Sequence, residues 1–164
     1  MATWATKPLE VYLRELQAGR ARTRRQAAAA LQVLGDRRAV GPLIAALTDD
    51  DKDVRAIAAR ALGALDDRHA VPPLLHALHD AHPDVRCAAA QALWRLGDRM
   101  AIHGLADALH DPEPLVRYFA ACALVYPYTP GGTNPPLIDP FGEHATLYHQ
   151  AKQAMMTERP SPPS

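Results

Sequence analysis

Apolar residues recur along this chain at the spacing of two helices separated by a short polar break. The first series lies at i, i+4, i+7, i+8 and i+11, which is one helical face, and consists of Val54, Ala58, Ala61, Leu62 and Leu65. The second lies at i, i+3, i+4 and i+7 and consists of Val71, Leu74, Leu75 and Leu78. The pattern predicts a pair of amphipathic helices that must bury their apolar faces against neighbours.

The same helical pair recurs at a fixed step. The string Val-Arg-x-x-Ala-Ala-x-Ala-Leu begins at Val54, Val85 and Val116, each 31 residues after the one before, and Thr23 begins an earlier copy with Thr in place of Val. A period of this length is typical of a solenoid of stacked units. We therefore predict an all-α, right-handed solenoid of about four two-helix repeats, which start near residues 23, 54, 85 and 116.

The breaks inside the repeats and the two ends of the chain complete the prediction. The first helices that begin near residues 23, 54 and 85 are followed by Gly or Asp and then by Asp, as at Gly35-Asp36, where glycine suits a helix end and aspartate a helix start. Pro42 and Pro73 lie about one turn inside the second helices and predict a kink or a late helix start there. We expect a solenoid over residues 1–126, opened by a capping helix at 8–19, and then a Pro-rich loop, a capping helix at about 141–157 and a disordered tail within 127–164.

Composition and charge restrict the function classes. Lys plus Arg equals Asp plus Glu, at 18 each, so the net basic charge of many nucleic-acid binders is absent. A local basic cluster exists at Arg20, Arg22, Arg24 and Arg25. No apolar run approaches the roughly 20 residues that span a bilayer, and the first residues do not read as a signal peptide. We expect a cytoplasmic monomer in which Cys87 and Cys122 are reduced thiols.

Two ionic series and eight histidines are candidates for chemistry. Arginines recur at residues 24, 55, 86 and 117, and aspartates recur at residues 36, 67 and 98. We predict that these arginines and aspartates pair and hold successive units together; an anion-binding track is the alternative. A His/Asp group formed by His76, His79, Asp107 and His110 could hold a metal, but basic residues also suit the ends of these helices. We predict no metal site and no cofactor.

The repeat units resemble a known family. In the first complete unit the shared residues are Gly35-Asp36-Arg37, Ala39-Val40, Pro42-Leu43 and Ala46-Leu47, followed by the helix that begins at Val54. These residues resemble the HEAT-like repeats first described in phycobilin lyases, which form an armadillo/HEAT-type superhelix. The third unit departs from the pattern, because Gly104 stands where the others have proline.

The resemblance implies that the Val-Arg helices line a concave face with an interaction surface. Carried onto this sequence, its residues are Arg25, Gln26, Ile57, Arg60, Cys87, Gln91, Arg95, Tyr118 and Phe119. Tyrosine and arginine are typical of protein-binding surfaces, although Tyr118 and Phe119 could instead pack against the C-terminal cap. We expect a non-catalytic scaffold that binds a protein or peptide. The first alternative is an accessory protein of the phycobilin-lyase type or a chromophore chaperone, and the second is a binder of the nucleic-acid backbone.

Overall fold

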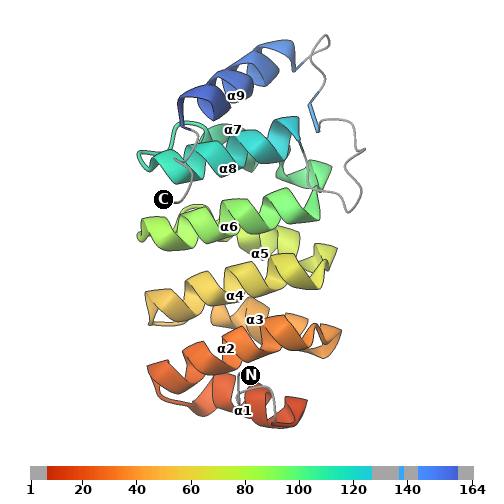
Figure 1. Cartoon of the computed structure of the whole chain (residues 1–164), viewed down its shortest axis with the longest axis vertical. Coiled ribbons are helices and arrows are strands. Elements are labelled where there is room, and N and C mark those ends of the chain that lie inside the picture. The colour runs from red at the N-terminus through yellow and green to blue at the C-terminus, as the bar shows by residue number, and fades with distance from the viewer. Residues whose placement is uncertain (1–6, 127–136, 139–143, 159–164) are drawn as a thin grey trace, which may run out of the picture.

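A computed structural model describes residues 7–126, 137–138 and 144–158, and within them all regular structure is helical (Figure 1). The longer helices are α1 (Leu9–Ala18), α2 (Ala21–Leu34), α4 (Lys52–Leu65), α6 (Pro83–Leu96), α8 (Pro114–Val125) and α9 (Ala145–Thr157). The shorter helices are α3 (Val40–Ala46), α5 (Val71–Ala77) and α7 (Ile102–Ala108). Each of these three is preceded by one 3₁₀ turn, respectively η1 (Arg37–Ala39), η2 (Arg68–Ala70) and η3 (Arg99–Ala101).

The helices stack in two layers, which confirms the predicted all-α solenoid. Helices α2, α4, α6 and α8 lie side by side, each in contact with the next, and form what we call the front layer (Figure 1). Helices α3, α5 and α7 lie behind it and pack on α4, α6 and α8 respectively. At the two ends, α1 packs against α2 and α9 packs against α8.

The helix ends follow the residue types that the sequence places there. Gly35 and Gly97 end α2 and α6 in the left-handed conformation, with φ of 67° and 54°. The aspartate that follows each break caps the 3₁₀ turn; the Asp36 carboxylate, for example, accepts a hydrogen bond from the Arg38 N–H at 2.9 Å. The late helix start predicted from proline is also present, because α3 begins only after η1 and Pro42 is its third residue. Proline is tolerated there because the first-turn N–H groups have no intrahelical acceptor.

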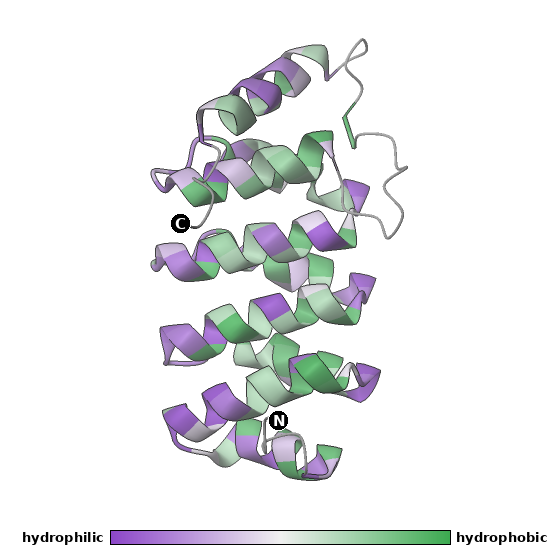
Figure 2. Cartoon of the chain, viewed as in Figure 1, coloured by the Kyte–Doolittle hydropathy of each residue, from purple (hydrophilic) through white to green (hydrophobic). Residues whose placement is uncertain are grey.

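Alanine and leucine fill the core. Ala58, Ala59, Ala61 and Leu62 of α4 are all fully buried, and so are their equivalents in α8. Because alanine side chains are small, adjacent front-layer helices can approach closely. Figure 2 shows hydrophilic residues at both ends of these helices and mostly hydrophobic ones between. The core therefore runs unbroken along the stack.

The arginine series pairs with a different aspartate series from the one predicted. Arg55 donates from Nε and Nη2 to Asp80 at 2.7 and 3.0 Å, and from Nη1 to the carbonyl of Asp49 at 2.7 Å. Arg24 pairs in the same way with Asp49, and Arg86 with Asp111. The predicted partners Asp36, Asp67 and Asp98 cap the 3₁₀ turns instead. Each arginine thus joins the turn before its own helix to the turn one unit further on.

The predicted end caps are helices, although one begins later than expected. Helix α1 buries Tyr12 and Leu16, and Leu9 and Leu13 pack against the same core. Helix α9 starts at Ala145 and ends close to Glu158, whose carboxylate takes the place of the aspartate as partner of Arg117. Phe141, most of the Pro-rich loop and the tail lie outside the described residues, whereas Leu137 and Ile138 are buried against the core.

Candidate functional site

The nine residues predicted to bind a partner all lie on the front layer. Helix α2 carries Arg25 and Gln26, α4 carries Ile57 and Arg60, α6 carries Cys87, Gln91 and Arg95, and α8 carries Tyr118 and Phe119. Gln26, Arg60 and Arg95 are exposed, and the other six are half-buried. The structure does not bring the nine into one site but distributes them over several environments.

Three of the nine meet in one shallow hollow. Arg60, Gln91 and Arg95 line a space of about 100 Å³ together with Gln32 and Ala92. The hollow spans α2, α4 and α6, and it presents two guanidinium groups and two side-chain amides. These groups are strong hydrogen-bond donors, and the amides also accept. The surface can therefore bind polar or acidic groups of a partner.

Gln32 was missed by the sequence prediction. It occupies the repeat position that Gly63 and Trp94 hold in the next two units. Gly63 is buried directly against Ala92 of α6 and offers no side chain to the surface. A comparison of this one position across the units could have drawn attention to it, since it changes from amide to glycine to indole.

Arg25 is already engaged within the front layer. Its Nη1 donates to the Asp53 carboxylate at 2.8 Å, and its Nη2 lies 3.4 Å from Asp51. Arg25 thus bridges α2 to the start of α4, and its charge is partly neutralised. Arg25 therefore helps to hold α2 and α4 together, in addition to lying on the predicted surface.

The two cysteines are poorly suited to act as nucleophiles. Burial raises the pKa of the Cys87 thiol to about 11, and the charge of Glu113 adds to the shift while Arg60 opposes it. Burial also raises the pKa of Cys122, against the opposing effect of a hydrogen bond with Tyr118. Because the thiolate is the reactive form, both side chains act as small apolar groups near neutral pH.

Aromatic rings cluster at the α8 end of the front layer. Phe119 packs between Trp94, at a centroid distance of 6.1 Å, and Tyr118, at 5.6 Å. The Trp94 indole also donates to the carbonyl of Tyr126 at 2.6 Å, so Trp94 links the end of α6 to the residue that follows α8. Tyr118 lines a separate hollow of about 520 Å³ with Tyr126, Lys152, Met155 and Met156, so it does face the capping helix α9.

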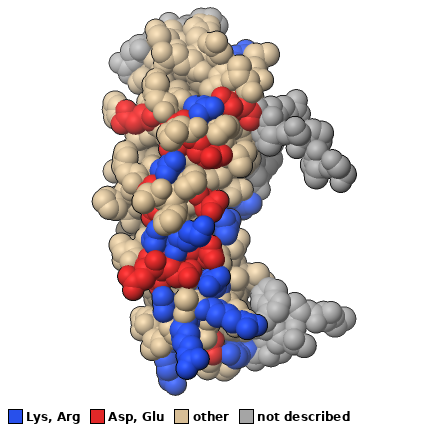
Figure 3. Space-filling model, turned by 90° about the vertical axis from the view of Figure 1, so that its left-hand side faces the viewer, with Lys and Arg blue, Asp and Glu red and all other residues tan. Residues whose placement is uncertain are grey.

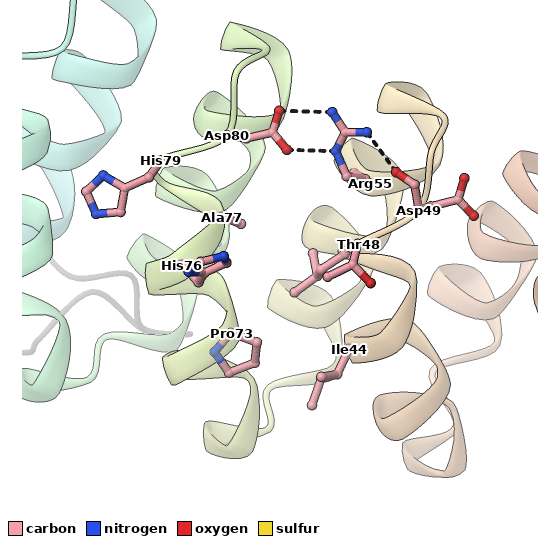
Figure 4. A pocket seen from close by; sticks show the side chains of 10 residues that line it. Ile44, Thr48, Asp49, Arg55, Pro73, His76, Ala77, His79 and Asp80 are labelled. Atoms are coloured by element: carbon pink, nitrogen blue, oxygen red, sulfur yellow. Dashed lines mark hydrogen bonds and ion pairs between the residues drawn. The ribbon is translucent and has the colours of Figure 1, made fainter.

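A further groove lies behind the front layer, between α3 and α5 (Figure 4). Its volume is about 550 Å³, and Ile44, Pro73 and Ala77 supply apolar walls. His76 and His79 also line it, and the Arg55–Asp80 pair closes one end. In the described part of the chain, no three His, Cys, Asp or Glu residues are placed to hold a metal ion.

Charged groups of both signs cover the face on which the turns meet. Figure 3 shows arginine and lysine gathered at the α1–α2 end, and acidic groups mixed with basic ones further along. No helix within the described ranges is long and apolar enough to cross a membrane.

Comparisons with known proteins agree on the fold. A family model described as HEAT repeats matches residues 9–83 and 71–130. The solved complex of CpcE and CpcF of phycocyanin lyase from Nostoc sp. PCC7120 contains a chain that is 31% identical, with a TM-score of 0.62. That match covers 92% of this chain and 54% of the other, so this chain spans about half of its relative's length.

Two further solved structures share the fold at lower identity. An engineered protein is 22% identical with a TM-score of 0.62, over 93% of this chain and 68% of the other. The YibA protein of E. coli is 17% identical with a TM-score of 0.60, over 96% of this chain and 62% of the other. Among curated proteins, none is similar enough to count as a match.

Proposed function

Because this chain belongs to the HEAT-repeat family, we propose that it is a non-catalytic scaffold that binds a protein or peptide through its front layer. The observation that carries the proposal is the hollow in which Arg60, Gln91 and Arg95 meet Gln32. Four long polar side chains from three successive front-layer helices converge there.

The chemistry of this surface suits recognition better than catalysis. Arginine and aromatic residues are enriched at protein interfaces, and the aromatic cluster of Trp94, Phe119 and Tyr118 lies beside the hollow on α6 and α8. Both thiols are held in the protonated form by burial. We therefore place the partner across α4, α6 and α8, with polar contacts at the hollow and apolar contacts at the rings.

Site-specific photo-crosslinking tests this proposal. A photoreactive amino acid replaces Gln91 in one variant and His103, an exposed residue of α7 behind the front layer, in a matched control. We expect one protein of the native lysate to crosslink at position 91 and not at position 103. The double substitution Arg60→Glu with Arg95→Glu should abolish that product while circular dichroism shows an unchanged helical fold. Equal crosslinking at both positions, or an undiminished product in the double variant, would contradict the proposal.

A second candidate is an accessory function in bilin attachment, and the 31% identity with a chain of the phycocyanin-lyase complex favours it. A bilin added to the purified protein should then show a shifted and sharpened absorption band, because a bound tetrapyrrole is held in one conformation. An unchanged spectrum across a concentration series would exclude this function for the isolated chain.

A further inference from the structure

Charge is distributed unevenly along the solenoid, although its total is balanced. Residues 7–38 contain eight of the 18 Lys and Arg but only three of the 18 Asp and Glu. The rest of the chain therefore contains ten basic and fifteen acidic residues, so the two parts carry formal charges of +5 and −5. Figure 3 shows the corresponding concentration of Lys and Arg side chains at the α1–α2 end.

Half of the eight cations in residues 7–38 already have acidic partners. Lys7 pairs with Glu15, Arg24 with Asp49, Arg25 with Asp53, and Arg38 with Asp36. Arg37 forms no ion pair with a described residue and donates instead to the backbone carbonyl of Asp66 at 3.3 Å. The remaining three arginines, Arg14, Arg20 and Arg22, are exposed and also form no ion pair with any residue that the structure describes. We call these three the basic end. The surplus positive charge of the α1–α2 unit thus lies on side chains that are free to bind outside groups.

Two of these arginines stand where the other repeats favour acids. At steps of 31 residues, Arg20 corresponds to Asp51, His82 and Glu113, and Arg22 corresponds to Asp53, Asp84 and Leu115, so two of the three equivalents are acidic in each case. All these positions open a front-layer helix, where the helix dipole favours a negative charge and disfavours a positive one. The Asp51 carboxylate also caps α4, since it accepts from the N–H groups of Asp53 and Val54 at 3.0 and 3.1 Å.

Arginine at positions 20 and 22 is therefore expected to stabilise the start of α2 less than an acidic residue would. Arg20 is the N-cap residue of α2 and makes no side-chain capping bond, and α2 has no acid in its first turn. Residues that break a local rule without a compensating contact are typical of functional surfaces. We therefore expect the favourable contacts of Arg20 and Arg22 to be made with a bound partner rather than within this chain.

We propose that the basic end, formed by Arg14, Arg20 and Arg22, docks an acidic segment of a partner protein. The surface is separate from the front-layer hollow and does not depend on it. Charge complementarity selects an acidic occupant, and the balanced net charge together with the lack of an aromatic residue in the basic end disfavours single-stranded nucleic acid. Exposed ion pairs are individually weak and screened by salt, so binding is expected to depend strongly on ionic strength.

The test uses a variant that should be more stable yet bind less. Arg20→Asp with Arg22→Asp restores the residue types of the α4 start, so the thermal midpoint is expected to rise by about 2–4 °C. In fluorescence anisotropy at low ionic strength, a labelled oligoglutamate peptide should bind wild-type protein and lose affinity on the order of tenfold or more with the variant. A gain in stability with a loss of binding excludes unfolding as the cause.

Two controls keep the result decisive. Arg68→Asp with Arg99→Asp changes the charge equally at exposed sites elsewhere and should leave peptide binding unchanged. Arg20→Gln with Arg22→Gln should weaken binding without the added capping residue. The proposal is overturned if the wild type does not bind the peptide or if both aspartate variants bind alike. It is also overturned if an oligothymidylate binds the same surface more tightly than the peptide, because the occupant would then be a nucleic acid.

Discussion

Asp66 adopts a backbone conformation that glycine adopts at the two equivalent positions of the other repeats. Its φ is 51°, close to the values of Gly35 and Gly97 at the ends of α2 and α6. The left-handed region costs a residue with a Cβ roughly 1–2 kcal/mol, less for aspartate than for most. The end of α4 is therefore the strained one of the three.

Asp66→Gly should stabilise the protein by roughly 0.5–1 kcal/mol, since relief of strain exceeds the added freedom of the unfolded chain. Gly35→Ala should have the opposite effect, by about 1 kcal/mol, because its added Cβ would meet no atom within 4 Å and only the backbone conformation is penalised. Urea unfolding of both variants measures these changes. Equal free energies of unfolding for the wild type and both variants would contradict the claim that Asp66 is strained.

Two glycines lie at contacts between helices but differ in what surrounds them. A Cβ on Gly63 of α4 would lie 2.7 Å from the Ala92 Cα and 2.9 Å from its Cβ. A Cβ on Gly104 of α7 would lie 2.5 Å from Leu75 Cδ2, the end of a flexible side chain. The first contact can be relieved only by moving helices α4 and α6 apart, and the second by rotating one leucine.

Gly63→Ala should lower the free energy of unfolding by about 1–3 kcal/mol, the usual range for overpacking. Gly104→Ala should change it by less than about 1 kcal/mol, because the better helix propensity of alanine offsets the displacement of Leu75. Chemical unfolding followed by circular dichroism compares the two. An equal loss in both variants would show that the front layer is no tighter than the layer behind it.

Across the whole molecule, the arginine series links each unit to the next. Asp49, Asp80 and Asp111 accept two guanidinium bonds each, and their side chains are at most 13% exposed. Burial raises the pKa of these carboxyls, but the hydrogen bonds from arginine and backbone together outweigh it and hold each pKa below its ordinary value of 3.8. The last arginine, Arg117, uses Glu158 of the C-terminal cap in the same way.

This arrangement predicts acid sensitivity of the entire stack. These carboxylates take up protons at a higher pH in the unfolded state than in the folded state. Their contribution to the free energy of unfolding is therefore complete above about pH 4, and it is lost as the pH falls through the lowered pKa values of the folded state. The urea midpoint should therefore drop steeply below pH 4 in the wild type. The triple variant with Asn at positions 49, 80 and 111 should be less stable at neutral pH and show a flatter acid limb. Parallel pH curves for the two proteins would count against this linkage.

Prediction from the sequence succeeded where a signal is local and periodic. Helix pairs, Gly and Asp at their ends, and the late start imposed by Pro42 all depend on residues within one or two turns of each other. Only some residues of the predicted surface lie together. Arg60, Gln91 and Arg95 meet in one hollow, whereas Tyr118 faces α9 and Phe119 packs against Trp94. Gln32 was missed because only the stacking of α2, α4 and α6 brings it to the same hollow as Arg60, Gln91 and Arg95.

The sequence by itself determined that this chain is an all-α solenoid, because a 31-residue period of amphipathic helices can bury its apolar faces only by stacking. It could not determine which acids the arginines bind. Aspartates 36, 67 and 98 and aspartates 49, 80 and 111 recur at the same step, so periodicity fits both series equally well. Only the packing of one turn above the next brings the second series within 2.7 Å of the guanidinium groups and leaves the first to cap the 3₁₀ turns.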